Sequence, residues 1–127
     1  MTNRLEIDRL LRELYAARLA GDLGGVCRLF TNDAKFEIIG TSHMSPTAIS
    51  AMGLDQIRTW MTLLIKTFQL TDQTILSMII DDARAAVHWR AKVRSRITGA
   101  TVLTDLVDLV QIRGGHIASY TEFFVPR

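Results

Sequence analysis

Residues 86–99, AVHWRAKVRSRITG, alternate between two kinds of side chain. His88, Arg90 and Lys92 are basic, whereas the residues between them are apolar. Because successive side chains of a β-strand point to opposite faces, this pattern predicts a strand with one basic and one apolar face. The basic residues line a site if their face of the strand points into the protein, and they contact water if it points outwards.

The segments that follow and precede this strand extend it into a sheet. Alternating or apolar runs at 70–80, 100–112 and 116–125 predict three more strands, and the turn sequences DD, TG and GG separate them from one another. We therefore expect the second half of the chain to be a meander of antiparallel hairpins.

The first half of the chain has a different periodicity. Apolar residues at helical spacing predict helices over 3–20, 23–30 and 57–68, and a strand is expected over 31–40. The small and polar stretch 41–53 is expected to be a long loop over a site. Helices that precede a long antiparallel sheet indicate the α+β class.

Length, charge and cysteine usage limit the function classes. The 127 residues suit one domain, residues 1–127, and 13 acidic residues are interspersed among 15 basic ones, so a nucleic-acid partner is not expected. The single cysteine, Cys27, cannot form an internal disulfide, and no apolar run is long enough for a membrane anchor. We expect a cytoplasmic protein with no metal or other cofactor, because no metal-ligand spacing, phosphate loop or nucleophile motif occurs.

Several phrases of the sequence, in their order, resemble the SnoaL-like branch of the nuclear-transport-factor-2-like superfamily. They lie at 15–37, 53–61, 94–99 and 112–124. The resemblance implies a cone-shaped barrel in which a curved, mostly antiparallel sheet wraps around three helices and leaves a pocket open at one end. It also implies a frequent homodimer. The superfamily includes ketosteroid isomerases, limonene epoxide hydrolase, polyketide cyclases and non-catalytic binding modules, so the residues must decide the function.

The ketosteroid isomerase pattern is matched at one of its three positions. The resemblance places Ile38 where those enzymes have a carboxylate base, and Leu14 at their tyrosine position, with Tyr15 beside it. Asp108 falls at the position of their late, protonated aspartate. A proton shuttle of that type therefore lacks its base.

The epoxide hydrolase pattern is also matched in part. Glu122 stands at the carboxylate position on the last strand, and Arg90 matches the arginine of an earlier strand. Lys92 replaces the second acid, and Phe36 and Ile38 replace the pair that holds the water. The resemblance to polyketide cyclases, which use a late acidic residue as acid and base, requires only Glu122.

The lengths of the loops determine which face of each strand points towards the pocket. A three-residue loop over 97–99, and another over 113–115, would each end in glycine as a bulged type I turn requires, and we predict both. A two-residue turn at 98–99 would instead put the basic face beside Leu103, Asp105 and Val107. The three-residue loops gather one polar face towards the pocket: His88, Arg90, Asp108, Tyr120 and Glu122.

The opposite face is then apolar and exposed. It is too large to leave in water on a monomer, and a second copy would cover it in an isologous dimer. The residues expected in this dimer interface are Trp89, Val107, Leu109 and Phe123.

Each candidate site residue has a functional and a structural interpretation. Glu122 is a general base or substrate anchor, or else the ion-pair partner of Arg90. Asp108 orients His88 as an acid–base group, or else forms a buried hydrogen bond. Aromatic and apolar side chains line the pocket or belong to the core; these are Tyr15, Phe36, Ile38, Trp60 and Tyr120.

Two functions remain open from the sequence. The first is binding of a small, largely hydrophobic molecule between sheet and helices, with acid–base catalysis of the isomerase, cyclase, lyase or hydrolase type by Glu122. The second is a non-catalytic ligand-binding or dimerisation module of the same fold. The polar cluster favours the first, and the apolar Phe36 and Ile38 favour the second.

Overall fold

The structure, a computed structural model, describes residues 3–41 and 46–127. Three helices occur in this part of the chain: α1 (Arg4–Ala20), α2 (Leu23–Cys27) and α3 (Leu54–Thr67). The side chain of Asn3 accepts a hydrogen bond from the backbone of Glu6 and starts α1, and Gly21 ends it in the left-handed conformation at φ 68°. Among the described helices, none is long and apolar enough to cross a membrane.

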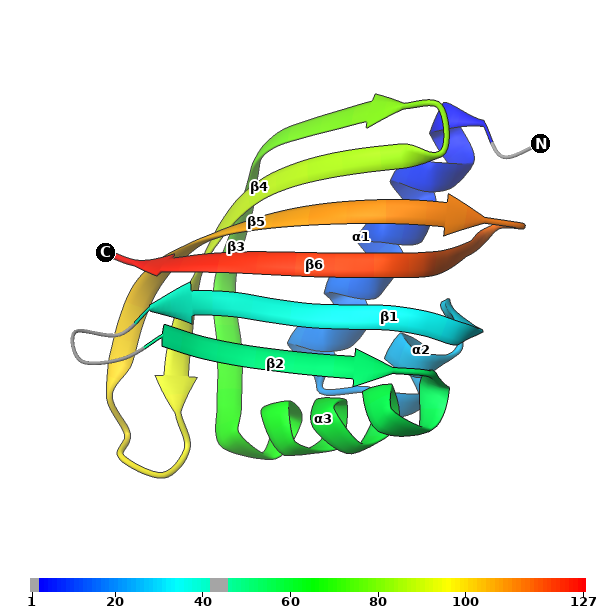
Figure 1. Cartoon of the computed structure of the whole chain (residues 1–127). Coiled ribbons are helices and arrows are strands. Elements are labelled where there is room, and N and C mark those ends of the chain that lie inside the picture. Colours follow the sequence, from blue (N-terminus) through cyan, green and yellow to red (C-terminus); the bar gives the residue numbers. More distant parts are fainter. Residues whose placement is uncertain (1–2, 42–45) are drawn as a thin grey trace.

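Six strands form one sheet in the order β2-β1-β6-β5-β4-β3. β1 and β6 pair in parallel and the other neighbours are antiparallel. The sheet curves around α1, and α3 packs beside β1, β2 and the start of β3 (Figure 1). The α+β class is confirmed, and the sheet stays open because β2 and β3 are free edges. The strands are β1 (Phe30–Thr41), β2 (Pro46–Met52), β3 (Phe68–Asp81), β4 (Arg84–Ser95), β5 (Thr101–Arg113) and β6 (His116–Pro126).

The expected long loop over 41–53 is wrong for most of its length. Residues 46–52 form β2, which pairs with β1 so that Ile49 lies opposite Ile38. The small and polar composition hid a strand whose stability comes from its neighbour rather than from its own propensity. His43, which the sequence offers either as a gate of the pocket or as an exposed side chain, lies outside the described residues.

The hairpin between β4 and β5 differs from the predicted three-residue loop. Ser95 lies opposite Ala100, and the loop is four residues long, 96–99. The Ser95 hydroxyl accepts hydrogen bonds from two backbone N–H groups of the loop, and Gly99 has a φ of 79°. Arg90 therefore pairs with Asp105 instead of Leu106, and every side chain of β4 faces the side opposite to that predicted.

The hairpin between β5 and β6 also differs, but its inward face is the predicted one. Gly114 and Gly115 both have positive φ and form a two-residue turn. A bulge between Gln111 and Ile112 then shifts the register. Asp108 lies opposite Glu122 rather than Tyr120, and because the total shift is two residues, all three point to the same face.

The core fills the space between α1 and the concave face of the sheet. Trp89, Tyr15, Tyr120 and Phe36 are its largest fully buried side chains. Phe36 stacks on Tyr120 with ring centroids 5.6 Å apart, and Tyr15 contacts Trp89 at 5.2 Å. Two carboxyl groups, Asp108 on β5 and Glu122 on β6, are buried beside these aromatic rings.

Candidate functional site

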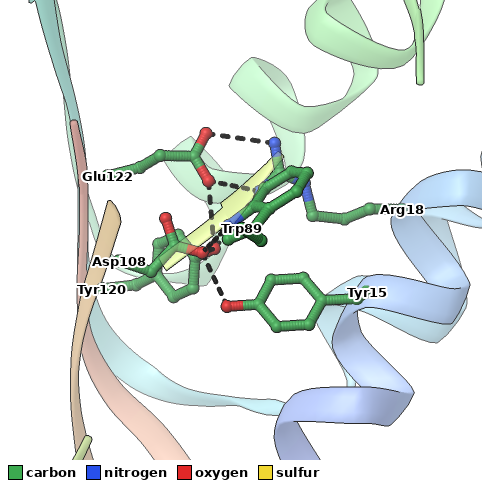
Figure 2. A network of polar contacts seen from close by, with 6 residues as sticks. All are labelled: Tyr15, Arg18, Trp89, Asp108, Tyr120 and Glu122. Carbon is green, nitrogen blue, oxygen red and sulfur yellow. Dashed lines mark hydrogen bonds and ion pairs between the residues drawn. The ribbon is translucent and has the colours of Figure 1, made fainter. Parts of the chain in front are cut away.

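Asp108 lies at the centre of a buried polar network on the inner face of β5. One of its oxygens, Oδ2, accepts hydrogen bonds from Tyr15 Oη at 2.7 Å and from Trp89 Nε1 at 2.7 Å. Tyr120 Oη also contacts this oxygen. The three partners come from α1, β4 and β6, so the network joins the helix to the sheet (Figure 2).

Glu122 lies directly opposite Asp108 in the β5–β6 pair. It is held by Arg18 from the last turn of α1. Arg18 donates two hydrogen bonds to the two carboxylate oxygens, at 2.6 Å and 3.2 Å. The side chains are only 10% and 3% exposed, so this is a buried ion pair. The guanidinium also lies 5.4 Å from the ring centroid of Trp89, a cation–π distance.

Tyr120 connects the two carboxyl groups. Its hydroxyl lies 3.1 Å from Glu122 Oε2, contacts Asp108 Oδ2, and accepts a hydrogen bond from Arg18 at 3.2 Å. A tyrosine has one hydroxyl hydrogen, so it can donate to one carboxyl group only. If Asp108 is protonated, it donates its hydrogen to the Tyr120 hydroxyl, and that hydroxyl donates its own hydrogen to Glu122. Each of the two contacts is then a hydrogen bond.

The electrostatics of the site agree with this assignment of protons. Burial and the charge of Glu122 raise the pKa of Asp108 well above its usual value. Burial opposes ionisation of Glu122, but the charge and hydrogen bonds of Arg18 outweigh it and lower the pKa of Glu122. Burial and Asp108 raise the pKa of Tyr15. These directions favour an ionised Arg18–Glu122 pair beside a protonated Asp108, the same arrangement that supplies a hydrogen to both contacts of Tyr120.

A pocket of about 310 Å³ opens beside the ion pair, between α3 and the sheet. Arg18, Glu122 and Ile38 line it, whereas Asp108, Tyr15 and Tyr120 lie behind this lining. Two further polar residues, Ser95 and Thr104, are uncharged. The apolar wall includes Met61, Leu64, Ile65, Leu70, Val93, Val102, Leu106 and Phe124.

His88 and Arg90 were expected in the pocket, and this prediction is wrong. Both lie on the outer face of the sheet, where each contacts Asp105, at 3.1 Å and 2.6 Å. Arg127 joins the same carboxylate at 3.0 Å. The four-residue loop after β4 is the physical reason, because it reverses the face of every residue on that strand.

The predicted position of Trp89 is wrong for the same reason. This side chain was expected in an exposed dimer interface, but it is fully buried and bonds to Asp108. Of the aromatic residues expected to line the pocket, Phe36, Tyr15 and Tyr120 are core side chains, and Trp60 packs against the core without lining the pocket. Glu122 and Ile38 are the predicted site residues that reach the pocket wall.

Arg18 is the site residue that sequence reasoning missed. A signal was present, because Arg18 follows Leu11 by seven residues and Leu14 by four, which places it on the buried stripe of α1. A cation on such a stripe requires a buried acidic partner. Sequence reasoning instead gave Arg90 as the partner of Glu122, but Arg90 lies on the opposite face of the sheet.

The described residues show no group of three or more His, Cys, Asp or Glu side chains placed to hold a metal ion. Beside the pocket, the side chains supply a carboxylate, a guanidinium and a linked buried acid, namely Glu122, Arg18 and Asp108.

A family model described as the SnoaL-like domain matches residues 11–120, so the chain belongs to the SnoaL-like family. No curated protein matches the sequence.

Solved structures share the fold at low sequence identity. A Bacillus subtilis protein proposed to be an isomerase has a TM-score of 0.84 at 20% identity, over 98% of this chain and 90% of that one. A nuclear-transport-factor-2-like protein from Burkholderia xenovorans gives 0.76 at 16%, over 98% and 93%. An epoxide hydrolase from M. tuberculosis, described as similar to limonene epoxide hydrolase, gives 0.76 at 15%, over 95% and 84%. At these identities, the likeness shows the fold alone.

Proposed function

We propose that residues 1–127 act as one domain that binds a small, largely hydrophobic molecule in the pocket between α3 and the sheet. The observation that carries the proposal is the combination of an apolar wall with the Arg18–Glu122 pair on one side of it. Ligand pockets commonly have such a composition, a mostly apolar surface with a few convergent polar groups. A volume of about 310 Å³ suits a small ligand.

A thermal-shift screen of hydrophobic carbonyl, epoxide and carboxylate compounds tests this proposal, since a ligand of the native state raises Tm. Leu106→Trp fills the pocket from its wall and should abolish the shift. Leu103→Trp on the same strand is the control, because Leu103 is exposed on the outer face and does not line the pocket. A shift that survives in Leu106→Trp would place the binding elsewhere.

We propose acid–base catalysis by Glu122 as the more specific form of this function. Glu122 lines the pocket as a carboxylate and is linked through Tyr120 to the protonated Asp108, so the site holds both a proton acceptor and a proton source. Incubation of a bound ketone in heavy water tests it: deuterium should enter next to the carbonyl group with the wild type and not with Glu122→Gln.

A non-catalytic binding module is the second candidate. Arg18 holds both oxygens of Glu122, which lowers the basicity of the carboxylate, and β1 contributes only Phe36 and Ile38 at the expected catalytic positions. Ligand binding without any deuterium incorporation would support this candidate.

A homodimer through the outer face of the sheet remains part of the proposal, without Trp89. Val107, Leu109 and Phe123 are 37–48% exposed there, and Val107 lies directly opposite Phe123. Light scattering of wild type and Val107→Lys tests it, with a monomer expected for the variant. A cytoplasmic location and the lack of a nucleic-acid partner stay predictions from the sequence.

A further inference from the structure

The charged lining of the pocket consists of one cation and one anion that neutralise each other. Arg18 and Glu122 are joined by two hydrogen bonds, and both are almost fully buried. The other residues that line the pocket are apolar or uncharged, with Ser95 and Thr104 the polar ones among them. Among the described residues that line it, the pocket therefore has no net charge and no second ion that could neutralise a charged ligand.

A charged ligand would disturb this balance. A carboxylate that reaches Arg18 must displace Glu122 or lie beside it, and an ammonium group that reaches Glu122 meets Arg18 in the same way. The first arrangement leaves a buried ion without a partner and the second brings like charges together, and both are costly away from water.

The Arg18 guanidinium is held in this position and cannot easily move towards a charged ligand. Its guanidinium lies over Trp89 at 5.4 Å and donates a hydrogen bond to Tyr120 at 3.2 Å. Both partners are fully buried, so the cation is fixed from behind. The three hydrogen bonds to Tyr120 and Glu122 leave further N–H groups of Arg18 without a partner among the described residues.

Building on the proposed function, we propose that the ligand is an uncharged molecule whose hydrogen-bonding oxygen, a carbonyl or hydroxyl, accepts from Arg18 while its apolar body fills the pocket. A neutral acceptor satisfies the free N–H groups without separating the ion pair. The same charge balance predicts that the preference for uncharged over anionic ligands can be reversed. Removing the charge of Glu122 leaves Arg18 uncompensated, and the pocket should then prefer an anion.

The test compares head groups on one apolar body. The probes are 4-phenylbutan-2-one, 3-phenylpropanoate and 3-phenylpropylamine, together with the same three head groups on a heptyl chain, titrated by NMR at neutral pH. We expect the ketones to bind the wild type about tenfold or more tighter than either charged series, because only they leave the ion pair intact. Shifts of resonances from residues that line the pocket identify the site.

Variants of the ion pair test whether the preference changes from uncharged ligands to anions. In Glu122→Gln, the carboxylates should bind more tightly than the ketones. In the double variant Asp108→Asn/Glu122→Gln, Arg18 is the only charge in the network, so ionisation of Asp108 cannot mask this effect. Glu37→Gln is the matched control, because Glu37 pairs with Lys35 at 2.7 Å outside the pocket lining, and it should keep the wild-type order.

The outcomes separate the inference from the proposed function. If none of the six probes binds the wild type, the proposed pocket function is overturned and the inference with it. If a charged probe binds the wild type as tightly as its ketone, the pocket function stands and the inference fails. Should Glu122→Gln not fold, the order of the head groups on the wild type decides by itself.

Discussion

Asp105 and Asp108 lie three residues apart on β5 and face opposite sides of the sheet. Three residues surround each carboxyl group. Basic side chains surround Asp105 on the outer face, namely His88, Arg90 and Arg127. Asp108 on the inner face has neutral aromatic hydrogen-bond partners instead, namely Tyr15, Trp89 and Tyr120.

The two aspartates show that the number of hydrogen-bond partners does not fix the charge of a carboxyl group. Hydrogen bonds from Arg90, together with the other basic neighbours, lower the pKa of Asp105 far below its usual value. Burial and the charge of Glu122 raise the pKa of Asp108. One face of the sheet therefore carries an ion cluster in contact with water, and the other a neutral acid beside a buried ion pair.

The largest expected effect comes from breaking the inner ion pair. Arg18→Met leaves Glu122 buried without its partner, which should lower the free energy of unfolding by about 3–5 kcal/mol. Urea denaturation measures the change. Arg12→Met on the same helix is the control, because Arg12 forms an exposed pair with Asp8 and should change stability little. Equal effects of the two substitutions would show that Arg18 is not part of a buried pair.

The second prediction concerns pH. Asp108 binds its proton more tightly in the folded than in the unfolded protein, so its contribution is fully present below the unfolded pKa of about 4 and is lost as pH rises through the folded pKa. The stability of the wild type relative to Asp108→Asn should therefore fall with rising pH, by at most about 1.4 kcal/mol per pH unit. Denaturation of both proteins across pH measures this difference.

Asp105→Asn should show the opposite slope. The pKa of Asp105 is lowered by folding, so its contribution is present above the unfolded pKa and is lost as pH falls through the folded value. Slopes of the same sign for the two variants would contradict the comparison between the faces.

A further prediction tests the direction in which the side chains of β4 point. Trp89→Phe removes one donor from Asp108 within the core, which should cost about 1–3 kcal/mol. His88→Phe, at the neighbouring position on the outer face, should change the stability less, because its side chain is 39% exposed. Thermal unfolding of both variants measures the effects, and a larger loss for His88→Phe would mean that the basic face points inward.

Much of the fold could be predicted from local patterns. Helical spacing predicted α1 and α3, and alternation predicted β3 to β6, because these periods depend only on neighbouring residues. β2 could not be predicted, since its small and polar residues become a strand by pairing with β1. The position of Glu122 at the pocket followed from its parity with Asp108 and Tyr120, which the bulge in the β5–β6 pair preserved.

The sequence by itself determined the helices, the strands other than β2, the two-faced character of residues 86–99 and the common face of Asp108 and Glu122. Only the tertiary structure decided that Trp89 points inward, that Arg90 binds Asp105 outside, and that Arg18 is the partner of Glu122. The physical reason is that side-chain alternation is local, whereas facing depends on register, which a single additional loop residue after Ser95 reverses. The pairing of Arg18 with Glu122 joins α1 to β6 and depends on how the sheet curves around the helix.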